Sequence, residues 1–226
     1  GKTFYEYEIG DKGIVAWALG ATGAYAVSTT GKEVAAPSDF DGLPLRAGAA
    51  LQTMTLEELG VNPVTMPAAQ AYEALSRGTI EGILLSVADW KSYSLLDTLK
   101  YTIDGVALGH WESYHAISED SWNMLSEEEK AAFDRIARET AIANAEFIET
   151  QAEEVAAAAR ERGATFVMIG DMSPAMQDHV ATAARDTWAQ WIEQTEANGH
   201  PARAAARLWA ELVQEEGGVL PEGVEE

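Results

Sequence analysis

One uninterrupted helical pattern of unusual length is the feature of this sequence that most restricts its fold. It begins at Ser126-Glu127-Glu128-Glu129, a capping box in which the serine and the third glutamate satisfy backbone groups of the first turn. Apolar residues then recur at roughly helical spacing until about Arg162. Residues 155–159 are small and uncharged, so we expect this end of the helix to pack closely on another element.

The chain before this helix alternates short apolar runs with helical stretches. Strands are expected at residues 14–19, 43–46, 62–66 and 79–85, and helices at residues 48–59 and 67–77. Gly60 and Gly78 follow these helices in the position where a left-handed backbone ends a helix. After the long helix we expect a strand at 164–169, a helix that starts at Ser173-Pro174 and a last helix that Pro201 opens. This succession predicts an α/β protein with parallel strands.

The charge balance limits the possible partners. Acidic residues outnumber basic ones, 37 against 15, which gives a formal net charge of -22. Such a surface repels polyanions, so nucleic acid and anionic membrane are poor partners, and solubility is the ordinary role of the acidity. An anionic ligand would need a local cationic group. No stretch approaches the roughly 20 apolar residues of a membrane span, so direct membrane insertion is not expected.

Sequence signatures of catalysis are missing. There is no cysteine, no G-x-S-x-G turn and no H-E-x-x-H pair among the four histidines. One partial likeness remains: Gly20-Ala21-Thr22-Gly23 follows a strand, as in the phosphate-binding turn of dinucleotide folds. Ala26 replaces the third glycine, and the β-branched residues 27–30 are poor for the required helix. An NAD(P)-dependent oxidoreductase using this turn is therefore the alternative function.

Three blocks in the middle of the chain carry a family resemblance. They are Asp39-Phe40-Asp41-Gly42-Leu43-Pro44-Leu45-Arg46, Asn62-Pro63-Val64-Thr65-Met66-Pro67 and Ala71-Tyr72-Glu73-Ala74-Leu75-Ser76-Arg77-Gly78-Thr79-Ile80-Glu81-Gly82. In order and spacing they resemble the solute-binding proteins of TRAP transporters, the DctP-like family, which read D-L-K-G-L-K-I-R-V, L-G-A-x-P-V-P-M and Y-x-A-L-Q-x-G-V-V-D-G. The similarity continues through the long helix and covers nearly the whole chain.

The resemblance implies a fold and a working place. The fold is a periplasmic-binding-protein-like, two-lobed α/β clamshell with a long connecting helix. Family members begin with a further βαβ lobe, so we expect this chain to be a fragment. We assign residues 1–22 to the end of lobe 1, residues 23–111 to lobe 2 with the carboxylate site, residues 112–163 to the return to lobe 1 and the long helix, and residues 164–226 to a strand and helices that pack across the lobes.

The resemblance also implies a function. The protein is expected to be a monomer without enzymatic activity, cofactor or metal. It would capture a small organic acid in the periplasm and deliver it to the membrane subunits of a TRAP transporter. A sensory or scaffold domain that kept the fold without transport is a further alternative.

Arg46 is the residue to which the resemblance assigns the ligand carboxylate. A guanidinium at a strand end, beside the start of a helix at residues 48–51, offers a two-pronged donor and a positive helix terminus to an anion. The ordinary alternative is a salt bridge between Arg46 and one of the many nearby acids.

Departures from the family pattern indicate the kind of acid. Tyr25 stands where many members carry a second arginine, Leu85 where they carry an asparagine, and Ala68 where an aromatic residue is frequent. A second ligand carboxylate would lose its partners, and space is gained. We therefore expect a monocarboxylate with a sizeable apolar or aromatic body.

Aromatic residues at strand ends are candidates for contact with that body. The ligand ring is expected against Trp90, Trp111 or Tyr25, because the ends of strands are where ligands meet α/β sheets. Polar groups of the ligand would be met by His110 or Tyr114. The remaining tryptophans of the second half, Trp122, Trp188, Trp191 and Trp209, are assigned to packing.

Overall fold

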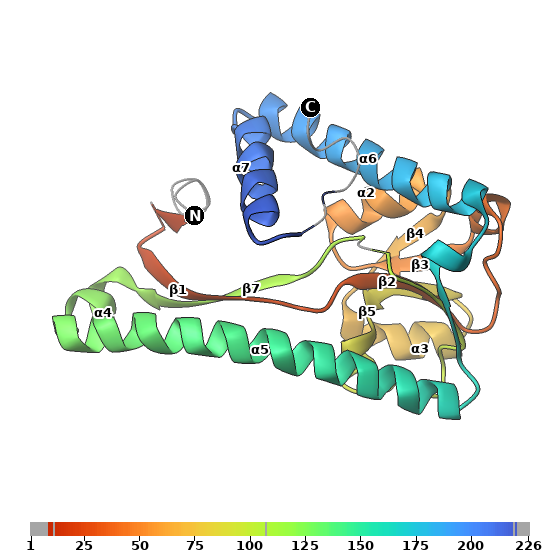
Figure 1. The fold of residues 1–226 in the computed structure, drawn as a ribbon, viewed down its shortest axis with the longest axis horizontal. Coiled ribbons are helices and arrows are strands. Elements are labelled where there is room, and N and C mark those ends of the chain that lie inside the picture. Colours follow the sequence, from red (N-terminus) through yellow and green to blue (C-terminus); the bar gives the residue numbers. More distant parts are fainter. Residues whose placement is uncertain (1–8, 11, 107, 219, 221–226) are drawn as a thin grey trace.

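The computed structural model describes residues 9–10, 12–106, 108–218 and 220 of the chain (Figure 1). Its strands are β1 (Ile14–Ala21), β2 (Tyr25–Thr29), β3 (Pro44–Ala47), β4 (Asn62–Thr65), β5 (Gly82–Ser86), β6 (Tyr101–Asp104), β7 (Glu112–Ser118) and β8 (Thr165–Met168). Its α-helices are α2 (Ala50–Glu58), α3 (Ala71–Ser76), α4 (Glu119–Asn123), α5 (Glu127–Glu161), α6 (Pro174–Ala197) and α7 (Ala202–Glu215). Short 3₁₀ turns are η2 (Pro37–Phe40), η3 (Ala68–Gln70), η4 (Val87–Asp89) and η5 (Ile169–Asp171).

A six-stranded sheet in the order β4-β3-β5-β2-β6-β8 forms the centre of the molecule. Strand β3 runs parallel to β4 and β5, and β6 runs parallel to β8, which confirms the expected parallel pairing in the first half. Strand β2 is antiparallel to both of its neighbours, β5 and β6, and was not expected from the sequence. Because of this reversal, the beginning of β2 lies at the same sheet edge as the carboxyl ends of β3, β5 and β6.

The strand expected at residues 14–19 forms, but it does not join the central sheet. It is β1, which pairs antiparallel with β7 in a separate two-stranded ribbon, from Ile14 opposite Ser118 to Ala21 opposite Glu112. The ribbon lies along α5 and leads away from the sheet (Figure 1).

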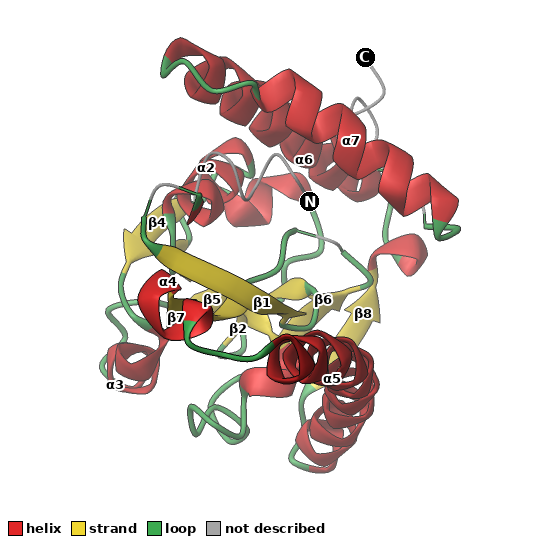
Figure 2. Cartoon of the chain, turned by 90° about the vertical axis from the view of Figure 1, so that its left-hand side faces the viewer, coloured by secondary structure: helices red, strands yellow, loops and turns green. Residues whose placement is uncertain are grey.

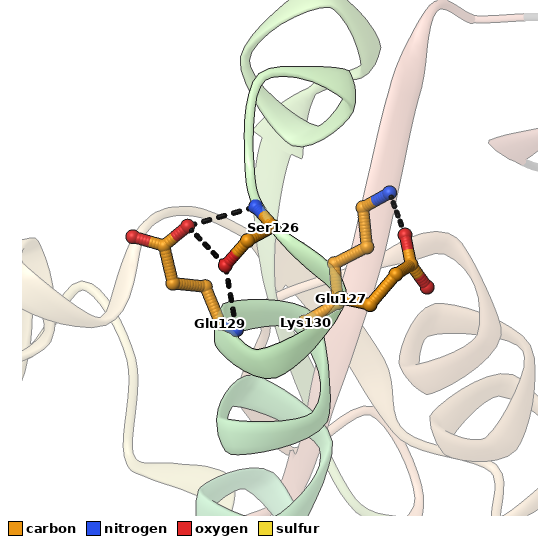
Figure 3. A network of polar contacts seen from close by, with 4 residues as sticks. All are labelled: Ser126, Glu127, Glu129 and Lys130. Atoms are coloured by element: carbon orange, nitrogen blue, oxygen red, sulfur yellow. Dashed lines mark hydrogen bonds and ion pairs between the residues drawn. The ribbon is translucent and has the colours of Figure 1, made fainter.

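Helix α5 confirms the pattern that opened the sequence. Its start is capped as expected: the Ser126 Oγ accepts the Glu129 backbone N–H at 3.3 Å, and the Glu129 Oε2 accepts the Ser126 backbone N–H at 2.8 Å (Figure 3). At its far end Val155 and Ala159 are fully buried, and this part of the helix packs on η4 and β8. The predicted close packing of residues 155–159 is thus confirmed.

Helices cover both faces of the sheet. Helices α2, α6 and α7 lie on one side, whereas α3 and the end of α5 lie on the other (Figure 2). Helix α2 packs on α6, β3 and β4, and α7 packs on α6. The expected helix at 67–77 is shorter than predicted, because the three residues after Pro67 form the 3₁₀ turn η3 and α3 begins only afterwards. Within the described part of the chain, no helix combines the length and the apolar composition needed to cross a bilayer.

Candidate functional site

Arg46 lies in β3 near its carboxyl end, and the protein covers all but 5% of its surface. Its Nε donates a hydrogen bond of 2.9 Å to the carbonyl oxygen of Met66, which follows β4. Its Nη1 lies 3.5 Å from the carbonyl oxygen of Leu84 in β5, at the outer limit of hydrogen bonding. Carbonyls from the two neighbouring strands therefore fix one edge of the guanidinium.

The other edge of the guanidinium is free among the residues that the structure describes. Nη2 has no hydrogen bond there, and no carboxylate forms an ion pair with Arg46. The salt bridge considered as the ordinary alternative is therefore not found. Burial lowers the pKa of Arg46 from its usual value, because a charged group loses hydration inside the protein. An oriented cation that lacks a counter-charge is suited to hold an anion.

Gly48 allows the guanidinium to lie where it does. A Cβ atom on Gly48 would lie 2.8 Å from the Arg46 Cζ and closer still to Nη2, well inside ordinary contact. The backbone N–H of Gly48 donates to the Gln52 Oε1 at 2.6 Å. The first turn of α2 is thus arranged around Arg46, with a polar side chain beside it.

Tyr25, at the beginning of β2, belongs to the same group of residues. Its side chain is buried, with 4% of its surface exposed, and the side chains of Thr22 and Gln52 act on the pKa of its phenol. Burial raises the pKa of Tyr25, which keeps the hydroxyl protonated at neutral pH; the charge of Arg46 acts in the opposite sense. The structure therefore brings Tyr25 close to Arg46, and Gln52 is a member of the group that the sequence did not reveal.

Leu85 and Ala68 flank this group. Leu85 is buried in β5, next to Leu84 and paired with Ala26 of β2. Ala68 is half-buried at the start of η3, two residues after Met66, whose carbonyl holds Arg46. Both residues thus lie at the sheet edge where Arg46 points.

His110 and Trp111 both contact Thr22, which precedes β2 and Tyr25. The His110 Nδ1 lies 3.1 Å from the Thr22 carbonyl oxygen, and the Trp111 backbone N–H donates to the Thr22 Oγ1 at 3.0 Å. Half of the Trp111 surface is exposed. Tyr114 lies farther along β7, opposite Leu19, and is also half exposed. The structure thus brings His110 and Trp111 to the crossing between sheet and ribbon, and places Tyr114 beyond it.

Trp90 does not lie where the sequence analysis expected it. Its side chain is fully buried and packs on Phe166 of β8, with ring centroids 5.7 Å apart. The reason is η4, because this turn directs the residue that follows it into the space between β8 and the end of α5. In this arrangement the ring is part of the core, and no face of it is open to a ligand.

Two side chains near the site escaped the sequence analysis. Asp89 is the last residue of η4, directly after β5, and Tyr93 follows one turn later. The charge of Asp89 raises the pKa of Tyr25, and Tyr93 acts on the pKa of Arg46, so both lie within electrostatic reach of the group. Their positions after β5 could have suggested this, since ligands bind at the carboxyl ends of strands.

The turn at residues 20–23 has a different setting from a dinucleotide site. Gly20 belongs to β1, and the next element after Gly23 is the strand β2. No helix begins there, so the backbone N–H groups that would meet a pyrophosphate are not presented. A shallow hollow of about 480 Å³ lies elsewhere, where Pro201 and α7 meet the end of α6.

A family profile matches most of the chain. The family described as bacterial extracellular solute-binding protein, family 7 (DctP), matches residues 3–195. A curated protein of Albidiferax ferrireducens, described as a solute-binding protein, is 28% identical over 131 residues, which are 57% of this chain and 35% of that protein. The matched segment thus spans about a third of the relative.

Solved structures share the fold. A marine metagenome TRAP solute binding protein specific for aromatic acid ligands, in complex with metahydroxyphenylacetate, has a TM-score of 0.80 at 19% identity; the match covers 94% of this chain and 68% of that one. A TRAP periplasmic solute binding protein from Bordetella bronchiseptica with bound mandelate has a TM-score of 0.76 at 22% identity, over 90% and 65% of the two chains. One from Rhodoferax ferrireducens with bound malonate has a TM-score of 0.75 at 22% identity, over 91% and 65%.

Proposed function

Because the chain belongs to the bacterial extracellular solute-binding proteins of family 7, we propose that it supplies the ligand site of a TRAP transporter receptor. In this role it captures a small organic acid outside the cytoplasmic membrane and delivers it to membrane subunits. The relatives are solute-binding proteins and not enzymes, which agrees with a site that is built for holding an anion.

The observation that carries the proposal is the state of Arg46. Two carbonyl oxygens orient one edge of its guanidinium, while the other edge lacks a partner among the described residues. A buried cation without a counter-charge is unfavourable, and an incoming carboxylate removes that cost by forming charge-assisted hydrogen bonds. Binding and orientation of the ligand would then come from the same side chain.

The surroundings of Arg46 favour a monocarboxylate with an apolar or aromatic body. Tyr25 and Leu85 supply ring and aliphatic surface where a second cation or an amide would be needed for a second carboxylate. Trp111 adds an exposed indole, whose backbone N–H is bonded to Thr22. Relatives with this fold include one specific for aromatic acids and one with bound mandelate, which are monocarboxylates, although another holds the dicarboxylate malonate.

We assign closure of the site to the connection between sheet and ribbon. Residues 23–111 carry Arg46 and its neighbours. The chain crosses between the ribbon and the sheet twice, once after Ala21 and once before Glu112, and the Trp111–Thr22 hydrogen bond joins the two crossings. Rotation about these two crossings, together with bending of α5, whose far end stays packed on η4 and β8, would move the ribbon and the start of α5 relative to Arg46, as in hinge closure of binding proteins. The domain boundaries assigned from the sequence, at residues 22 and 111, are part of this proposal.

Titration calorimetry tests the function. The panel contains 3-hydroxyphenylacetate, mandelate, 3-hydroxybenzoate, pyroglutamate, glucuronate, malonate and succinate. At least one monocarboxylate is expected to bind. Arg46→Ala should weaken that binding by about 10- to 150-fold, since hydrogen bonds to charged groups contribute about 1.5–3 kcal/mol. Arg77→Ala is the matched control, because Arg77 lies exposed on the surface next to Glu73.

Three results would count against parts of the proposal. If no acid binds, the receptor function fails. If succinate binds tightest, the monocarboxylate assignment fails while acid capture stands. If NADPH fluorescence rises on mixing with the protein, the oxidoreductase alternative gains support, although the strand after Gly23 lacks the helix that such a site needs.

A further inference from the structure

Asp89 is an acidic residue beside a site that we propose to bind acids. It ends η4, which continues directly from β5, and its side chain is half-buried. Burial raises the pKa of Asp89, because the charged carboxylate loses hydration, and no cation offsets this effect. An acid at this place opposes a purely anionic ligand, so its presence calls for an explanation from the chemistry of the ligand.

The carboxylate of Asp89 has no hydrogen bond or ion pair within the described ranges. Acids in the first turn of a helix are usually satisfied by backbone N–H groups. Here that role falls to Ser86, whose Oγ accepts the N–H of Ala88 at 3.3 Å. Lys91, two residues away, pairs instead with Glu154 at 3.9 Å. A half-buried carboxylate without a donor costs free energy, unless a ligand provides the donor.

Arg46 and Asp89 both act on the Tyr25 phenol. The charge of Arg46 lowers the pKa of the Tyr25 phenol, and the charge of Asp89 raises it. Within the described residues Arg46 and Asp89 form no ion pair, since the hydrogen bonds of Arg46 go to the carbonyls of Met66 and Leu84. In the fold, Tyr25 stands opposite Ser86 in the β2–β5 ladder, three residues before Asp89. A cation held at Leu84, a phenol opposite Ser86 and the Asp89 acceptor thus adjoin the carboxyl end of β5.

We propose that Asp89 selects acids that carry a hydroxyl or N–H donor in addition to their carboxylate, by accepting a hydrogen bond from that donor while Arg46 holds the carboxylate. This selection rests on the proposed function, because it needs an acid held at Arg46. A second ligand carboxylate near Asp89 would meet like charge and is rejected. The preferred class is therefore hydroxylated or N–H-bearing monocarboxylates.

Pairs of acids that differ by one donor isolate this contact. Mandelate and 3-hydroxyphenylacetate each add one hydroxyl to phenylacetate, at different positions, and 3-hydroxybenzoate adds one to benzoate. The wild-type protein should bind at least one hydroxylated acid at least about tenfold more tightly than its parent acid. A hydrogen bond to a charged acceptor contributes about 1.5–3 kcal/mol, which corresponds to that factor or more. Malonate serves as the probe for a second carboxylate.

Two variants and one control complete the test. Asp89→Asn and Asp89→Ala should lower the hydroxylated-to-parent ratio toward one, leave phenylacetate or benzoate within about threefold, and improve malonate binding, since the repelling charge is gone. Asp97→Asn is the control. Asp97 is an exposed aspartate on the same connection between β5 and β6 as Asp89, and it forms an ion pair with Arg162 at the end of α5. This control should change neither the ratio nor malonate binding.

The outcomes separate the two proposals. Failure of every acid to bind the wild-type protein overturns the proposed function and the selection together. Binding of parent acids as tightly as their hydroxylated partners, or an unchanged ratio in both Asp89 variants, overturns the selection alone. A ratio that also falls in Asp97→Asn assigns the effect to overall charge and likewise overturns the role of Asp89.

Discussion

Substitution of Gly48 by alanine should remove ligand binding while leaving the fold intact. The backbone of Gly48 does not have the positive φ that requires glycine, so alanine fits its conformation. The added Cβ, however, would lie 2.8 Å from the Arg46 Cζ, where ordinary contact begins at 3.4 Å, and closer still to Nη2. The guanidinium, as the end of a flexible side chain, must move by more than half an ångström and turn away from its present orientation.

The two expected effects differ in size and direction. Stability should change little, because replacing glycine by alanine at a compatible position contributes about 0.4–1 kcal/mol through the unfolded chain, which offsets the strain on Arg46. Binding should fall by about 10- to 150-fold, because displacement of the guanidinium forfeits charged hydrogen bonds that contribute about 1.5–3 kcal/mol. The N–H of Gly48 remains, so the contact with Gln52 persists.

The assay combines calorimetry with thermal unfolding. Gly170→Ala is the matched control, because a Cβ on Gly170 would meet no atom within 4 Å and its φ is not positive. Gly48→Ala should unfold near the wild-type temperature and bind the best acid of the panel weakly, whereas Gly170→Ala should bind it normally. A folded Gly48→Ala protein with wild-type affinity would refute the role of Arg46 as the anchor. A marked loss of melting temperature would refute the view that Arg46 absorbs the clash.

Three further changes have expected outcomes. Gly82→Ala should destabilise the protein by about 3 kcal/mol or more in urea unfolding, because its Cβ would overlap the backbone carbonyl oxygen of Ser28 in the adjacent strand; a mild effect would contradict the strand spacing. The hydrogen bond from the Ser126 amide lowers the pKa of Glu129, so Glu129→Gln should lower the melting temperature at pH 7. The difference between wild type and variant should disappear as the pH falls through that lowered pKa, and a pH-independent difference would contradict the role of the charged carboxylate. Trp90→Ala should cost about 3–5 kcal/mol, but Trp90→Phe less, because phenylalanine keeps a ring against Phe166 and removes an Nε1–H that lacks a hydrogen-bond partner in the described structure; equal losses would show that the packing of the ring does not stabilise the protein.

Elements with local signals could be predicted from the sequence. The start of α5 follows from Ser126 and Glu129, which act within one turn, and α6 follows from Ser173 and Pro174 in the same way. Helix α2 ends where expected, because Gly60 adopts a φ of +80°. These signals depend only on neighbouring residues, so tertiary packing did not override them.

Strand pairing could not be predicted in the same way. Strand β2 has only five residues, all buried, so it shows no alternation of apolar and polar positions, and its antiparallel direction depends on where the chain returns from the ribbon. Strand β1 was expected as a strand, but its partner β7 lies about a hundred residues away in the sequence. The sheet to which a strand belongs is a non-local property of this kind.

The same distinction between local and non-local features applies to the residues of the candidate site. Arg46 could be placed because its motif joins a strand end to a helix start, and both are local features. Asp89 and Trp90 are adjacent in sequence yet point to different surroundings, one half-buried beside the Tyr25 group and the other in the core against Phe166. The short turn η4 decides this, because successive side chains of a 3₁₀ helix point about 120° apart.

Two glycines close to Arg46 are set by close approach of neighbouring atoms. Gly82 lets β5 approach the Ser28 carbonyl of β2, and Gly48 leaves room for the guanidinium over the start of α2. Neither has a positive φ, so both are required by close approach and not by backbone conformation. The position of the Arg46 guanidinium therefore depends on a residue that carries no side chain, whereas Asp89 has no contact with it among the described residues. Exchanging Asp89 should redirect selectivity among acids, while filling Gly48 should weaken the capture of all of them alike.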